Sequence, residues 1–249
     1  MKILTWSDTN VGKVRKANED SFVVNKDLNL YLVADGMGGH KGGKKASSMA
    51  VSIVEQYIKN HFTDDLTEEQ LLKSALQEAN RQILTKSMAE DEFSGMGTTF
   101  TGLWHHNNLM HLVHVGDSRA YFFRDNKIEQ ITEDHTWVNE QFKAGYITKQ
   151  EAEASQYKSV ITRSIGFDAN LRIDYQQIHV TYGDVFLICS DGLSNLISTP
   201  ELEQLISANF FSDLPDILSE IALSRGAPDN FTFVICYLSN ELPEIKTSK

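Results

Sequence analysis

The chain has 249 residues, of which 41% are hydrophobic and 23% charged, values typical of one globular domain. Its formal net charge is −11, which argues against general binding to nucleic acids or anionic membranes because both are negatively charged. No apolar run approaches the roughly 18 residues of a membrane span, and the N-terminus turns polar too early for a signal peptide. We therefore expect a cytoplasmic protein without a membrane partner.

The first 34 residues predict three β-strands, at residues 2–7, 21–24 and 28–34. A polar loop between the first two strands is rich in side chains that could bind a ligand. The third strand ends at Asp35 and continues into a loop with five glycines. Glycine lets the backbone approach a ligand closely. A strand that ends in an aspartate and a glycine loop is therefore a candidate site.

Two helices are predicted after this loop. Apolar residues recur at helical spacing over 46–58 and again over 71–83. Thr67-Glu-Glu-Gln70 fits a capping box, which places the start of the second helix. Both apolar faces should pack against a sheet.

The remainder of the chain returns mainly to strands. Residues 97–131 read as short strands separated by turns, which favours an antiparallel sheet. A polar, partly helical insertion follows at 133–159, with a second capping box at Thr148-Lys-Gln-Glu151. Beyond it we predict strands near 160 and at 171–180, 185–189 and 231–238, and helices from 199 and over 214–224. Cys189 and Cys236 lie in two of these strands and are expected to be buried thiols.

The predicted organisation is one domain over residues 1–240 with helices and antiparallel sheets. The insertion at 133–159 belongs to this domain. Residues 241–249 are polar and are expected to form a frayed tail.

Aspartates recur at the ends of predicted strands. Asp35, Asp117 and Asp191 each follow an apolar strand and precede a glycine or serine, and Asp229 stands just before the last strand. Buried like charges repel one another unless a positive charge holds them. Mg²⁺ and Mn²⁺ prefer such oxygen ligands. The pattern predicts a metal-dependent hydrolase or a cation-binding module.

A nucleotide-binding loop is the competing interpretation of the glycine-rich stretch. Residues 38–45 come within one residue of the phosphate-binding pattern GxxxxGK[ST]. Its last position should offer a hydroxyl to Mg²⁺, which Lys45 cannot do. The alternating parallel strands and helices that normally surround such loops are also missing from the pattern.

With these motifs assembled, the chain resembles the metal-dependent protein phosphatases of the protein phosphatase 2C type, in their short bacterial form. The resemblance extends from about Thr5 to Leu238. The motifs occur in order as Gly12-x-Val14-Arg15-x-x-Asn18-Glu19-Asp20, Asp35-Gly-Met-Gly-Gly-His40, Gly97-Thr98-Thr99, Gly116-Asp-Ser-Arg119, Asp134-His135-Thr136, Thr162-Arg163-Ser164-Ile-Gly166, Ser190-Asp-Gly-Leu193 and Asp229-Asn230-x-Thr232.

The resemblance implies an α+β fold, a four-layer αββα sandwich of two antiparallel sheets with helices on both outer sides. It also implies a site for two Mn²⁺ or Mg²⁺ ions at one edge of the sandwich, with a third, weaker ion in bacterial members. The ligands implied for the two core ions are Asp35 as the bridge, the Gly36 carbonyl, Asp191 and Asp229. The third ion would use Asp117 and Asp191, and Glu19 and Asp20 would orient metal-bound waters.

The implied reaction is hydrolysis of phosphoserine and phosphothreonine by direct attack of a metal-bridging hydroxide, without a phospho-enzyme intermediate. Arg15 would bind the phosphate and His40 would protonate the leaving alkoxide. The implied partners are phosphorylated proteins, including a cognate Ser/Thr kinase and its substrates, and the protein is expected to be a monomer.

Departures from the family pattern bear on specificity. Lys44 and Lys45 stand where many bacterial relatives have an acidic residue. The resemblance implies that the insertion at 133–159 is a flap beside the catalytic site, and residues 155–159 differ from the sequence that relatives often carry there. A pseudo-phosphatase that binds phosphoproteins without turnover is the rival hypothesis. Such proteins usually lose a metal aspartate, and this chain retains all of them. We expect His135 to support the insertion. The four histidines on or beside a predicted hairpin are expected to be surface or packing residues: His105, His106, His111 and His114.

Overall fold

The structure is a computed structural model that describes residues 1–39, 41–63 and 65–240. Its strands are β1 (Lys2–Asn10), β2 (Ser21–Asn25), β3 (Leu30–Ala34), β4 (Gly36–Met37), β5 (Gly97–Thr98), β6 (Phe100–His106), β7 (Leu109–Val115), β8 (Arg119–Arg124), β9 (Lys127–Gln130), β10 (Asp174–His179), β11 (Val185–Cys189) and β12 (Phe231–Ser239). They form two five-stranded sheets, in the orders β1-β12-β11-β8-β9 and β10-β7-β6-β3-β2, and a small β4-β5 ribbon. All of the strand pairs are antiparallel.

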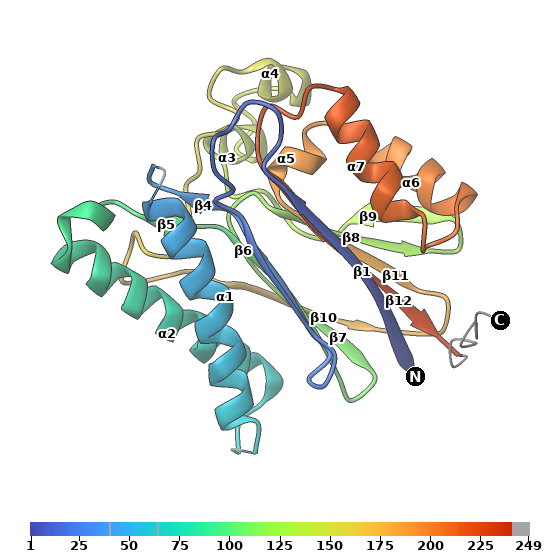
Figure 1. Ribbon diagram of the computed structural model, residues 1–249, viewed down its shortest axis with the longest axis horizontal. Helices are drawn as coiled ribbons and strands as arrows, with labels where there is room; N and C mark the ends of the chain where they lie inside the picture. The colour runs from blue at the N-terminus through green and yellow to red at the C-terminus, as the bar shows by residue number, and fades with distance from the viewer. Residues whose placement is uncertain (40, 64, 241–249) are drawn as a thin grey trace.

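Helices cover the outer face of each sheet (Figure 1). They are α1 (Gly42–His61), α2 (Glu68–Ala89), the short η1 (Asp91–Phe93), α3 (Trp137–Lys143), α4 (Lys149–Ala154), α5 (Asp191–Ser194), α6 (Thr199–Ala208) and α7 (Leu214–Ser224). One apolar cluster joins α1 and α2 to the second sheet, another joins α6 and α7 to the first, and a third lies between the sheets. This arrangement confirms the four-layer αββα sandwich.

The two long helices form for the reasons that the sequence predicts. Thr67 caps α2, since its hydroxyl accepts from the Gln70 amide while the Gln70 side chain accepts from the Thr67 amide. Leu72, Leu76 and Ile83 recur on one face of α2 and are fully buried. Burial of each such side chain contributes about 1.5–3 kcal/mol.

Element boundaries differ from the predictions where tertiary contacts decide them. Helix α1 begins at Gly42, earlier than its apolar stripe, because its glycine turn packs closely against Met96 and Glu19. No strand forms near residue 160; only an isolated bridge joins Thr136 to Ile161. The predicted tail at 241–249 lies outside the described residues.

Several short elements gather at one end of the sandwich. In Figure 1, α3, α4, α5 and the β4-β5 ribbon lie at the end opposite the N-terminus. No helix in the described part of the chain is long and apolar enough to cross a membrane.

Candidate active site

Five carboxylates from both sheets converge at this end of the molecule. Asp20 precedes β2, Asp35 follows β3 and Asp117 follows β7, all in the second sheet; Asp191 follows β11 and Asp229 precedes β12 in the first. The pKa of Asp35 is raised well above its usual value, chiefly by burial and then by the charges of the other four. The predicted metal residues are therefore brought together.

This cluster holds more negative charge than its protein surroundings neutralise. Burial, reinforced by Asp191 and Asp229, raises the pKa of Asp20 to about 6. Burial, reinforced by Asp191 and Asp134, raises the pKa of Asp117 to about 7. Carboxylate oxygens that repel one another in a site largely shielded from solvent are stabilised by a bound cation.

One oxygen of the cluster has an unused position for a ligand. Asp20 is only 1% exposed, and its Oδ2 accepts a hydrogen bond from the Ser190 hydroxyl at 2.8 Å. Its Oδ1 is buried without a hydrogen-bond partner in the described structure. A buried acceptor without a donor is costly, so a metal-bound water would satisfy it.

The carboxylates fit hard divalent cations that keep part of their water shell. Among the described residues, no group of three carboxylate, imidazole or thiol side chains is arranged to hold an ion by itself. Mg²⁺ is commonly bound through one or two carboxylates and retains several waters. The donor set therefore suits hydrated Mg²⁺ or Mn²⁺ better than zinc.

Close backbone packing explains the glycines beside Asp35. A Cβ atom at Gly36 would lie 2.1 Å from the Gly43 oxygen, and one at Gly43 would lie 2.0 Å from Glu19 Oε2. Only glycine lets β4, the start of α1 and Glu19 meet at this point. Gly36 is buried next to the cluster, and its role as a carbonyl ligand stays a prediction. His40, the predicted general acid, lies outside the described residues.

The structure pairs Arg15 with Asp229. The Arg15 guanidinium donates to Asp229 Oδ2 at 2.7 Å, and the two side chains are 53% and 36% exposed. This contact, together with the nearby Glu19 and Asp35 charges, raises the pKa of Arg15. The predicted phosphate-binding residue therefore lies beside the predicted metal residues, within reach of solvent.

Asn230 holds the loop that carries Arg15. Its Oδ1 accepts from the Glu19 amide at 2.8 Å, and its Nδ2 donates to the Val11 and Ala17 carbonyls at 2.9 and 3.0 Å. Asn230 and Ser190 belong to two of the sequence motifs, and no individual role was predicted for either residue. Their position next to a strand-end aspartate was the available signal.

The nucleotide-loop interpretation does not fit the structure. Both neighbours of β3 are antiparallel to it. Lys44 Nζ donates to the Asp20 carbonyl at 2.7 Å, so the lysine is bound to the backbone of the site. Lys44, which stands where many relatives have an acidic residue, therefore links α1 to the loop before β2.

Comparisons with known proteins agree with this geometry. Residues 13–225 match the family described as Protein phosphatase 2C. The serine/threonine phosphatase Stp of Listeria welshimeri is 35% identical over 234 residues, covering 91% of this chain and 92% of that protein. Protein phosphatase PhpP of Streptococcus pneumoniae is 33% identical over 237 residues, covering 94% and 96%.

Solved structures show the same similarity. The crystal structure of the Mycobacterium tuberculosis serine/threonine phosphatase PstP/Ppp superposes with a TM-score of 0.88 at 32% identity, covering 96% of this chain and 100% of that one. A structure of the PstP catalytic domain in complex with two manganese ions superposes with a TM-score of 0.83 at 31% identity, covering 96% and 99%.

Proposed function

The chain belongs to the protein phosphatase 2C family, in its bacterial form, and from that membership we propose that it hydrolyses phosphoserine and phosphothreonine in proteins with Mn²⁺ or Mg²⁺. The observation that carries the proposal is the convergence of five carboxylates from both sheets beside one arginine. A phosphate ester needs positive charge on its oxygens and a water nucleophile, and this site is built to collect cations.

The carboxylates would hold two core ions and a third, weaker one. Asp35, the Gly36 carbonyl, Asp191 and Asp229 are the proposed core ligands, and Asp117 with Asp191 would hold the third ion. Cations bound there supply an activated water as nucleophile and neutralise the phosphoryl oxygens. The complex of the related PstP domain with two manganese ions supports the two core ions.

The chain's own residues bind and orient the substrate. Arg15 binds phosphate oxygens through its planar guanidinium, for which it leaves or shares its bond to Asp229. Glu19 and Asp20 orient waters. Asn230 holds Glu19 in place, and Ser190 holds Asp20. His40 donates a proton to the departing serine or threonine oxygen.

Direct attack by water on phosphorus agrees with the protonated state of the two buried cysteine thiols. Burial raises the pKa of Cys189 to about 12 and that of Cys236 well above its usual value. A thiol without access to its thiolate form is a poor nucleophile. We propose hydrolysis without a phospho-enzyme intermediate.

The proposed partners are phosphorylated proteins, among them a Ser/Thr kinase whose action this protein reverses. We place it in the cytoplasm as a monomer, with residues 1–240 as one catalytic domain and residues 133–159 as an insertion beside the carboxylate site. The similarity to a serine/threonine phosphatase and to a protein phosphatase supports phosphorylated proteins as the substrates.

The test is hydrolysis of p-nitrophenyl phosphate and of a phosphothreonine peptide, each with Mn²⁺, with Mg²⁺ and with EDTA. We expect turnover only with a divalent cation. Turnover that persists in EDTA would contradict the proposed chemistry. Cation binding without any turnover would instead favour a phosphoprotein-binding protein that lacks catalysis.

A further inference from the structure

His135 is a buried residue at the base of the insertion, and it holds both backbone polar atoms of Gly116. The His135 amide donates to the Gly116 carbonyl at 2.8 Å, and the Gly116 amide donates to His135 Nδ1 at 3.0 Å. The side chain is 3% exposed. The residue that follows Gly116 is Asp117, one of the five converging carboxylates.

The corner at Gly116 has little freedom of its own. Gly116 has φ +109°, and a Cβ there would lie 2.7 Å from the Thr99 side chain. Thr99 in turn donates its amide to the Asp35 carbonyl at 2.9 Å and bonds through its hydroxyl to Ser118 at 2.8 Å. A shift of Gly116 therefore moves the Asp117 carboxylate, because Gly116 is confined by the Thr99 side chain and by its two bonds to His135.

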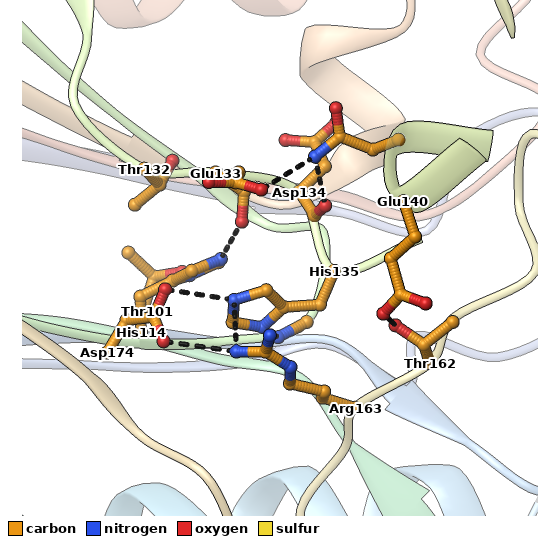
Figure 2. Close-up of polar contacts among 12 residues, drawn as sticks. Thr101, His114, Thr132, Glu133, Asp134, His135, Glu140, Thr162, Arg163 and Asp174 are labelled. Atoms are coloured by element: carbon orange, nitrogen blue, oxygen red, sulfur yellow. Dashed lines mark hydrogen bonds and ion pairs between the residues drawn. The ribbon is translucent and has the colours of Figure 1, made fainter. Parts of the chain in front are cut away.

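The other edge of the His135 ring is held by an ion pair (Figure 2). Because Nδ1 accepts from Gly116, a neutral ring carries its proton on Nε2. Nε2 lies 3.1 Å from Asp174 Oδ2, and Arg163 NH1 lies 3.1 Å from Asp174 Oδ1. Burial lowers the pKa of His135, which favours the neutral ring. Arg163 NH1 also lies 3.2 Å from Nε2, but a guanidinium cannot accept a proton. The Nε2 proton is therefore directed to Asp174, which favours the tautomer that can hold Gly116.

Both ends of the insertion meet at the same residue. The Thr162 amide donates to the His135 carbonyl at 2.9 Å, and Thr136 pairs with Ile161. Across this base, the Thr162 hydroxyl donates to Glu140 Oε1 in α3 at 2.7 Å. In Figure 2 the Glu140–Thr162 contact lies to the right of the imidazole, and the Arg163 guanidinium lies below it.

We propose that His135 is a positioning residue that sets the place of the Asp117 carboxylate through the Gly116 amide and links it to the insertion through Asp174 and Arg163. The inference rests on the proposed cation site, in which Asp117 is a ligand. It extends the expectation that His135 merely supports the insertion.

Two substitutions of His135 distinguish the role of Nδ1 from that of Nε2. The side-chain oxygen in His135→Asn can replace Nδ1 as the acceptor for the Gly116 amide, whereas the longer side chain in His135→Gln places its amide near the Nε2 position. Mn²⁺ binding to the metal-free protein is measured by titration calorimetry without substrate. We expect His135→Gln to weaken the weakest Mn²⁺ site about tenfold or more, and His135→Asn to restore most of that loss.

A double-mutant cycle shows whether the effect acts through Asp117. In the Asp117→Asn background, His135→Gln should weaken Mn²⁺ binding no further. Equal losses for Asn and Gln, or losses that simply add to that of Asp117→Asn, would overturn the inference. If His135→Gln does not fold, Asp174→Leu tests the same link, with the same expected cycle.

The outcome is distinguishable from that for the proposed function. A wild-type protein that binds Mn²⁺ but hydrolyses no phosphoester refutes the function and leaves the cycle to decide the role of His135. Full Mn²⁺-dependent turnover combined with additive losses refutes only the role of His135. A wild-type protein that binds no Mn²⁺ overturns both.

Discussion

At the residue scale, the negative charge on Asp35 is destabilising in the absence of a cation. Four other carboxylates surround it, and burial opposes its ionised form. Repulsion within the cluster destabilises the metal-free protein, and a bound cation relieves it. The Asp35 carboxylate therefore favours activity in the presence of a cation and lowers stability in its absence.

We predict that Asp35→Asn lowers Mn²⁺-dependent hydrolysis at least about a hundredfold, because a bridging ligand is lost. The same change should raise the unfolding midpoint in EDTA, by about 2–4 °C for each kcal/mol of repulsion removed. Both are read from p-nitrophenyl phosphate turnover and thermal unfolding. Glu129→Gln, an equal change of charge at an exposed position of β9, is the control and should alter neither. A lower midpoint for Asp35→Asn would contradict the repulsion argument.

Arg15 carries the second prediction at this scale. Lysine keeps the charge but lacks the planar fork, so Arg15→Lys should raise KM for p-nitrophenyl phosphate about tenfold, with a smaller change in kcat. Its bond to Asp229 is largely exposed and contributes little. The Mn²⁺ dissociation constant should therefore not rise. An unchanged KM, or a loss of Mn²⁺ binding, would show that Arg15 does not bind phosphate.

At the scale of elements, the two capping boxes have the same chemistry and different consequences. Thr67 begins α2, which buries a long apolar face in the core. Thr148 begins α4, a short helix of the insertion with no buried residue. A cap stabilises the whole fold only where the helix that it begins is packed into the core.

We predict that Thr67→Ala lowers the free energy of unfolding by about 1 kcal/mol, measured by urea denaturation, with turnover unchanged. The matched change Thr148→Ala should leave the global unfolding free energy within about 0.5 kcal/mol and speed proteolysis within residues 149–154, since only α4 frays. Equal losses of global stability would show that the insertion unfolds together with the core.

At the scale of the whole molecule, the buried His114 makes folding sensitive to acid. It is 1% exposed, and its Nδ1 and Nε2 bond to the Thr101 hydroxyl and the Glu133 carbonyl at 3.0 Å each. Burial, and then the His135 ring beside it, lower the pKa of His114 to about 4, while Asp134 and Asp174 act in the opposite direction. Because the unfolded chain binds a proton near pH 6.5, this contribution to stability is complete above that pH and is lost as the pH falls toward 4.

We predict that the difference in unfolding free energy between the wild type and His114→Gln falls by about 2 kcal/mol between pH 7 and pH 5. The variant lacks this titration, whereas the contributions of the carboxylates are common to both proteins and cancel. Urea denaturation in EDTA at the two pH values provides the measurement. A difference that is constant with pH would show that His114 is not held neutral.

The parts of the fold that depend on local chemistry could be predicted from sequence. Helix α7 has the predicted bounds, and both capping boxes are confirmed, because each depends on neighbouring side chains. The strand predicted near residue 160 was wrong, since a strand needs a partner and the chain there meets only an isolated bridge at Thr136. The early start of α1 was missed because the glycines at its start pack against Met96 and Glu19, which are distant in sequence.

The sequence by itself determined the types of element, the antiparallel class and the presence of an aspartate at several strand ends, because alternation, helical spacing and turn residues are local properties of the chain. Only the tertiary structure decided that these aspartates meet, that Arg15 bonds to Asp229 and that His135 holds the corner before Asp117. These contacts join residues up to 214 positions apart. Residues so far apart in the sequence come into contact only when the two sheets pack face to face. The periodicity of the sequence does not specify which strand ends will then be neighbours.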